Sequence, residues 1–221
     1  MLRSFAKKLL AALFPPDAVC CSCGREAVVD ERGLCPDCAA GIEVFNDAPI
    51  LKDIDGYTAP YVYNDVSARM VKRLKYGGAK HIAKHLADAV CIPAEWEIDA
   101  VVPIPLHYRR LRKRGFNQSE LIAKHIAERL GLKLGASLVV RRKDTKQQTR
   151  LSDAGRRRNI KGAFLADGSC RGMKVLLVDD VRTTGATLCE CAKELKACGC
   201  EKVYAATVCC VDPNRKGDPG F

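Results

Sequence analysis

One segment of the chain combines the residue types that hold a sugar phosphate. Four apolar residues at 175–178 precede two acids, Asp179 and Asp180, and a short loop then leads into a helix-forming stretch. Free N–H groups at a helix start attract phosphate, and glycine lets the main chain come close to it. The acids would accept hydrogen bonds from vicinal hydroxyls or reach Mg²⁺ through water. The loop supplies Thr183, Thr184, Gly185 and Thr187.

A phosphate beside two hydroxyls describes a ribose 5-phosphate. The chain has no Gly-x-x-x-x-Gly-Lys-Ser/Thr motif, which excludes a Walker-type NTPase, and no Gly-x-Gly-x-x-Gly motif of the dinucleotide-binding type. Helix capping alone would explain one acid and one threonine, but not all five polar residues. We therefore predict an anion site for a phosphorylated sugar at this loop.

Four cysteines have the spacing of a metal site. They form two Cys-x-x-Cys pairs with eleven residues between them, an arrangement that presents four thiolates tetrahedrally to Zn²⁺. Four ligands leave no open position, so the single zinc ion is expected to be structural. Cys21 is an alternative first ligand, but its one-residue spacing to the next cysteine is poorer. The predicted ligands are Cys20, Cys23, Cys35 and Cys38.

The positive charge is concentrated in two segments. Of the net charge of +11, residues 109–114 contribute +5 and residues 141–161 contribute +7, so the rest of the chain is close to neutral. Two basic clusters that flank a helix-like stretch are as consistent with an anion site as with a solvated face. We expect them to face a highly anionic ligand.

The compartment is expected to be the reducing cytoplasm. The chain has 13 cysteines, an odd number, and its first apolar run at residues 9–14 is too short for a secretion signal. No apolar run approaches the ~20 residues that span a bilayer.

The elements that must position these residues alternate between strands and helices. Strands are predicted at 100–104, 173–178 and 203–210, with a strand or hairpin at 57–64. Helices are predicted at 66–74, 80–90, 121–130 and 186–197, whereas residues 143–159 lack periodicity. This alternation predicts an α/β fold with a parallel sheet. An amphipathic helix at 2–13 and the cysteine segment form a separate unit, so the predicted domains are 1–48 and 49–221.

Several motifs along nearly the whole chain resemble two nested groups of proteins. The stretch from Val178 to Thr187 is similar to the signature of type I phosphoribosyltransferases. The whole set resembles the ComF family of competence-associated, phosphoribosyltransferase-like proteins with an N-terminal zinc ribbon. The motifs that carry this narrower resemblance, besides the cysteine pairs, are Leu74-Lys75-Tyr76-x-Gly, Val102-Pro103-Ile104-Pro105, Arg114-Gly115-Phe116-Asn117-Gln118, Gln148-Thr149-x-Leu151, Arg158-Asn159 and Gly162-Ala163-Phe164.

The resemblance implies 5-phosphoribosyl-1-pyrophosphate (PRPP) as the ligand, together with Mg²⁺, and a parallel sheet with helices on both faces. Asp179 and Asp180 would bind the ribose hydroxyls, and the turn after the 100–105 strand would be the pyrophosphate loop. Residues 143–159 would be the flexible loop that closes over the substrate. The PRPP-binding set continues through Val181, Arg182, Thr183, Thr184, Gly185, Ala186 and Thr187.

The leading hypothesis for the function is displacement of pyrophosphate at the anomeric carbon by a nitrogen nucleophile or water. Arg109, Arg110 and Arg114 would neutralise the charge that develops on pyrophosphate, with Arg114, Asp179 and Asp180 as the catalytic residues. The alternative is a non-catalytic module that senses PRPP or holds single-stranded DNA or a competence helicase. The cysteine segment 18–45 carries more acids than bases, which argues against DNA binding there.

Overall fold

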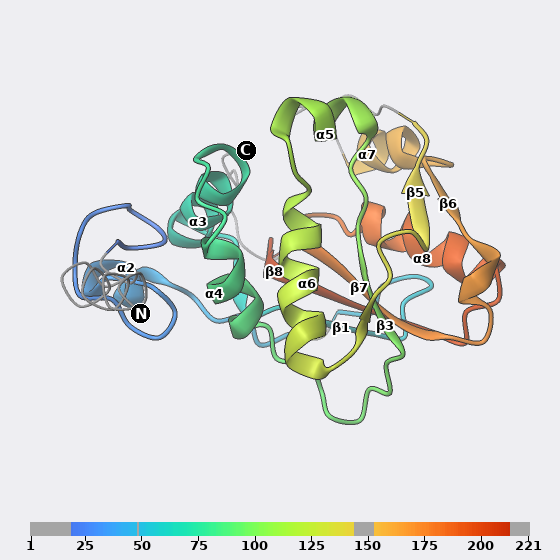
Figure 1. Ribbon diagram of the computed structural model, residues 1–221, viewed down its shortest axis with the longest axis horizontal. Coiled ribbons are helices and arrows are strands. Elements are labelled where there is room, and N and C mark those ends of the chain that lie inside the picture. Colours follow the sequence, from blue (N-terminus) through green and yellow to red (C-terminus); the bar gives the residue numbers. More distant parts are fainter. Residues whose placement is uncertain (1–18, 48, 144–152, 213–221) are drawn as a thin grey trace, which may run out of the picture.

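The computed structural model describes residues 19–47, 49–143 and 153–212. The helix predicted at 2–13 and most of the segment predicted to close over the substrate lie outside these residues. Within them the sheet is parallel, in the order β1-β8-β7-β3-β4, and β2 also pairs with β8 (Figure 1). The strands are β1 (Gly56–Thr58), β2 (Tyr61–Val62), β3 (Ala100–Pro103), β4 (Lys133–Leu134), β7 (Lys174–Arg182) and β8 (Lys202–Cys210).

Helices cover both faces of this sheet, as predicted. One face packs against α3 (Asp65–Tyr76), α4 (Ile82–Ala89) and α6 (Gln118–Leu130), and the other against α8 (Ala186–Ala197). Alternate residues of β7 serve the two faces: Leu176 and Val178 face the first core, whereas Val175 and Leu177 face the second. The strand that carries the polar residues after Val178 is therefore packed between two apolar cores.

The structure corrects one predicted strand end and defines two further segments. β7 does not end at residue 178 but runs to Arg182, because Asp179, Val181 and Arg182 keep their pairing with β8. Of the strand or hairpin predicted at 57–64, the structure has strands: β1 and β2 each pair in parallel with β8. The basic cluster at 109–114, for which no element was predicted, forms helix α5 (Tyr108–Arg114), which ends at Gly115 with φ +80°.

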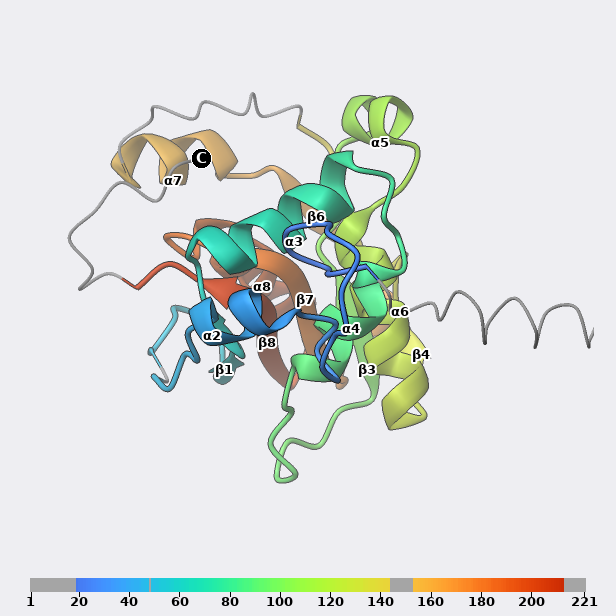
Figure 2. The ribbon, with the colours of Figure 1, turned by 90° about the vertical axis from the view of Figure 1, so that its left-hand side faces the viewer.

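Smaller elements complete the described structure. β5 (Val139–Arg141) and β6 (Phe164–Ala166) form an antiparallel pair, and α7 (Asp153–Ile160) occupies the end of the segment that lacked periodicity. A 3₁₀ turn, η1, spans Gly168–Cys170. In both views α5 and α7 lie at the same end of the molecule (Figures 1 and 2).

The cysteine segment lies beside the sheet domain, with α3 and α4 between it and the sheet. Figure 2 looks from that side and shows α2 (Pro36–Gly41) below α3 and in front of the sheet. Cys20, Cys35 and Leu34 are buried in the same apolar cluster as Met70 and Leu74 of α3. Among the described residues no helix is both long and apolar enough to cross a membrane.

Candidate functional site

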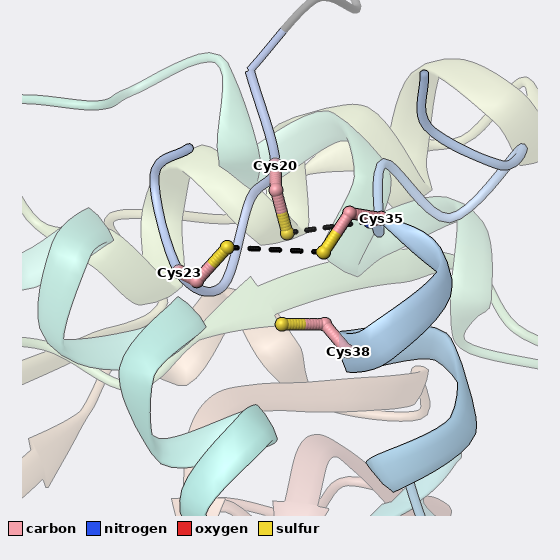
Figure 3. A group of neighbouring side chains, drawn as sticks. All are labelled: Cys20, Cys23, Cys35 and Cys38. Atoms are coloured by element: carbon pink, nitrogen blue, oxygen red, sulfur yellow. Dashed lines mark hydrogen bonds between the residues drawn. The ribbon is translucent and has the colours of Figure 1, made fainter. Parts of the chain in front are cut away.

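The four predicted metal ligands come together. Their sulfur atoms all lie within 4.8 Å of one another, and Figure 3 shows the four side chains converging on one space. Cys23 Sγ and Cys35 Sγ are 3.8 Å apart. This separation fits Zn²⁺, because four sulfurs at ~2.3 Å from one ion lie about 3.8 Å from each other. It is far too long for a disulfide, whose S–S bond is about 2 Å.

Basic side chains surround this cysteine cluster. A hydrogen bond from Arg25 lowers the pKa of Cys23 to about 6, so this thiol ionises readily. On the other side, the guanidinium of Arg69 lies 4.0 Å from Cys38 Sγ, and Arg73 donates a hydrogen bond to the carbonyl oxygen of Cys20. Zn²⁺ with four thiolates carries a net charge of −2, which these cations offset. The donor set and its surroundings therefore fit a structural zinc ion.

The two acids of the predicted sugar site occupy the C-terminal part of β7 in different environments. Asp180 is buried and forms an ion pair with Lys75 of α3. Burial alone would raise the pKa of Asp180, but the attraction of Lys75 outweighs it and holds this pKa below its ordinary value. Gln118 Nε2 also lies 3.5 Å from Asp180 Oδ1. Asp180 is thus held ionised by partners from two helices.

Asp179 remains partly accessible, and its pKa is shifted in the opposite direction. It accepts a 2.7 Å hydrogen bond from the hydroxyl of Ser119, at the start of α6. Burial and the negative charge of Asp180 together raise the pKa of Asp179 to about 7. The carboxylate pair therefore takes up or releases one proton near neutral pH.

The predicted phosphate loop follows directly. Gly185 is the N-cap of α8 and has φ +76°, a conformation that favours glycine. Gly185 has no side chain that could cap the helix. Among the described residues, the N–H of Ala186 has a hydroxyl acceptor nearby, Thr184 Oγ1 at 3.4 Å. Thr183, Thr184 and Thr187 are all partly exposed. The start of α8 thus offers N–H groups and hydroxyls next to the two acids.

Arg182 differs from its neighbours in the predicted loop, because its side chain is buried. Its guanidinium lies 4.9 Å from the ring centre of Tyr57 and 5.9 Å from that of Phe45, and it contacts Cys210 Sγ. Its Nε atom has no hydrogen-bond partner within the described part of the chain.

The three predicted pyrophosphate arginines all belong to α5, and among the described residues a hydrogen-bond path links Arg114 to the acids. Arg114 donates a hydrogen bond to Gln118 Oε1, and Gln118 in turn approaches Asp180. Arg114 also lies 5.1 Å from the ring centre of Tyr76. Arg109 lies over the ring of Tyr108, on the exposed side of α5.

Three polar side chains of the site had no predicted role: Lys75, Gln118 and Ser119. Lys75 and Gln118 lie inside two of the motifs that carry the family resemblance, and this is the signal by which sequence could have found them. Ser119 follows Gln118 directly, but nothing in its spacing connects it to Asp179.

The fold and the site define a phosphoribosyltransferase-type domain, and residues 116–219 match the family model described as "Phosphoribosyl transferase domain". A DNA utilization protein, YhgH, from Salmonella typhi is 30% identical over 213 residues, covering 86% of this chain and 89% of the relative. Competence protein F from Haemophilus influenzae is 37% identical over 48% of this chain and 47% of its own. Competence protein ComFC from Bacillus subtilis is 30% identical over 86% of this chain and 75% of its own.

With these relatives the chain belongs to the ComF family.

Proposed function

We propose that this chain binds PRPP with Mg²⁺ and displaces its pyrophosphate. The observation that supports the proposal is the position of the start of α8 next to Asp179 and Asp180 at the C-terminal part of β7. Parallel α/β sheets bind ligands at this edge. The 5-phosphate would accept hydrogen bonds from the main chain and hydroxyls of residues 183–187.

The ribose would lie over the acids. Asp179 is the partly exposed member of the pair, so we assign it the direct contact with the ribose hydroxyls. Asp180 forms an ion pair with Lys75 and would contribute to the same site through its charge, which raises the pKa of Asp179. The diphosphate would then extend toward α5, where Arg114 is already linked to this pair through Gln118.

The reaction follows from this placement. A nitrogen nucleophile or water forms a bond to the anomeric carbon while the carbon–oxygen bond to the diphosphate breaks, and the electron pair leaves with pyrophosphate. The sugar would gain positive charge next to the ionised Asp180, and pyrophosphate would gain negative charge beside Arg109, Arg110 and Arg114. Mg²⁺ would neutralise the diphosphate oxygens and needs few protein ligands. Among the described residues the only cluster of metal-ligating side chains is that of the four cysteines, which we assign to Zn²⁺.

Titration calorimetry of the purified chain with Mg²⁺ and PRPP tests the binding step. We expect Asp179→Asn to lose most of the affinity and Asp167→Asn to keep it, because Asp167 only caps the 3₁₀ turn η1. Equal affinity in both variants would contradict the site. Release of pyrophosphate with ammonia, water or a nitrogenous base as acceptor then tests turnover.

Single-stranded DNA is the second candidate ligand, and two exposed rings favour it. Tyr76 and Tyr108 are 66% and 58% exposed, and each lies beside an arginine of α5. Bases stack on such rings while arginines hold the phosphates. Anisotropy of a labelled oligonucleotide across salt concentrations, with and without PRPP, separates the alternatives: competition indicates one shared anion site, and independence indicates two.

The names of the relatives suggest the biological setting. Because they are called competence and DNA utilization proteins, we propose that this chain also serves DNA uptake, with single-stranded DNA or a competence helicase as partner. We propose the reducing cytoplasm as the compartment, because cysteine pairs with metal-site spacing are typical of it. We retain 1–48 and 49–221 as the proposed domains.

A further inference from the structure

Helix α3 contacts both the cysteine cluster and the carboxylate pair. Val66, Arg69 and Arg73 of this helix contact the cysteine segment, whereas Lys75 contacts β7. On the first side, Ser22 Oγ donates a 3.0 Å hydrogen bond to the carbonyl oxygen of Val66, and Arg69 Nε donates one of 3.2 Å to Ser22 Oγ. Arg73 donates to the carbonyl oxygen of Cys20.

At the other end of α3, Lys75 and Tyr76 contact the proposed ligand site. Lys75 forms the ion pair with Asp180, and the ring of Tyr76 lies under the guanidinium of Arg114. Arg73 and Lys75 are only two residues apart, so a single turn of helix joins a zinc ligand to the carboxylate pair.

Both ends of α3 are fixed by capping hydrogen bonds. Asn64 and Ser67 form a reciprocal capping box at its N-terminus, and the N–H of Gly77 bonds to the carbonyl of Arg73 at its C-terminus. Met70 and Leu74 are buried in the apolar cluster that also contains Cys20 and Cys35. A change in the cysteine segment therefore displaces the whole helix more easily than it bends it.

We propose that the zinc centre sets the affinity of the phosphoribosyl site by holding α3, with Arg73 and Lys75 as the positioning residues that connect them. This inference rests on the proposed function. Without the metal the loop at residues 20–24 loses its fixed shape, the carbonyl of Cys20 no longer anchors Arg73, and Lys75 is no longer held against Asp180.

The test is a cycle that combines zinc removal with Arg73→Ala in the full chain. Calorimetry measures the affinity for PRPP with Mg²⁺ in the zinc-loaded and chelator-stripped forms of both proteins. We expect stripping to weaken binding to wild type by roughly tenfold, within the usual range of coupling between two sites. Zinc-loaded Arg73→Ala should already be weakened to a similar degree, and stripping it should change little more.

Arg32→Ala is the matched control, because Arg32 lies in the same cysteine segment and its ion pair in the described part of the chain is with Asp30, not with α3. It should keep its zinc and its affinity. The inference is overturned if zinc-loaded Arg73→Ala binds PRPP like wild type, or if stripping weakens both proteins by the same factor. If stripping unfolds the chain, the loaded variants decide alone. If Arg73→Ala does not hold zinc, Arg73→Lys takes its place, with a smaller loss expected.

Hydrogen exchange gives a second readout that does not depend on PRPP. Amides in the last turn of α3 should exchange faster in stripped wild type and in loaded Arg73→Ala, and at the wild-type rate in Arg32→Ala. Unchanged exchange would overturn the coupling. If loaded wild type binds no PRPP while the exchange changes as expected, the proposed function fails and the link through α3 stands.

Discussion

Lys75 and Asp180 form a buried ion pair although more than a hundred residues separate them in the chain. Only 20% and 6% of the two side chains are exposed. The pair joins α3 to the sheet and decides which of two adjacent acids is ionised, because the ionised Asp180 makes ionisation of Asp179 unfavourable.

Removal of Lys75 is expected to destabilise the fold. Lys75→Met leaves the Asp180 carboxylate buried without its partner, which costs about 3–5 kcal/mol of unfolding free energy. Urea unfolding at pH 7 measures this. Lys84→Met is the control, since the exposed pair of Lys84 with Asp88 contributes less than about 1 kcal/mol. Similar losses of unfolding free energy in the two variants would show that the buried ion pair stabilises the fold no more than the exposed one.

The raised pKa of Asp179 predicts a pH dependence of stability. In the native state this pKa is about 7, against an ordinary value of 3.8. Between these values the native state holds a proton that the unfolded state has released, so stability contributed by the protonated acid is lost as the pH rises from about 4 to about 7.

Asp179→Asn removes this effect, because the amide does not ionise. We expect the unfolding free energy of wild type, relative to the variant, to fall between pH 4 and 7 by at most about 4 kcal/mol. Denaturant titrations at several pH values measure the difference. A constant difference across this range would mean that Asp179 titrates as an ordinary exposed acid.

Gly185→Ala is expected to damage both stability and ligand binding. The residue has φ +76°, and an added Cβ would lie 3.2 Å from Leu51 Cδ2. The left-handed conformation alone costs about 1–2 kcal/mol. Gly131→Ala provides the comparison, because Gly131 has φ +67° with no atom near the new Cβ and lies at the far end of α6. The position at the phosphate loop should lose more stability, and only it should lose affinity for PRPP.

Loss of one cysteine ligand should release the metal. Cys35→Ser is expected to lower the zinc content from one ion per chain to nearly none, since Cys35 is one of the four converging ligands. Elemental analysis of the purified protein measures this. Cys91→Ser should keep its zinc, because Cys91 is exposed and lies outside the cluster. Equal zinc content in the two variants would contradict the assignment.

The local parts of the site could be predicted from the sequence. The two Cys-x-x-Cys pairs are local in sequence, and so is the connection from β7 to α8. Both features can therefore be predicted from residues that are close together in the chain. The end of β7 cannot, because whether Asp179 and Val181 stay in the sheet depends on pairing with Thr207 and Cys209 of β8.

Contacts between distant segments could not be predicted. The roles of Lys75 and Ser119 arise only when α3 and α6 pack on the same face of the sheet. Arg182 was grouped with the phosphate loop, yet the rings of Phe45 and Tyr57 cover its side chain. A basic cluster at 109–114 has no apolar periodicity, so its helix was also missed. In each case tertiary packing, not local pattern, decides the outcome.

The place of β8 in the sheet has a consequence for how the chain folds. β1 and β2 come early in the sequence, but both pair with β8, which ends at Cys210, and Gly56 is aligned with Tyr204. Such pairing closes a very long loop, a step that is slow and costly in entropy. During synthesis these early strands must wait for the last strand to leave the ribosome, so a chain truncated before β8 would expose its sheet edges and aggregate.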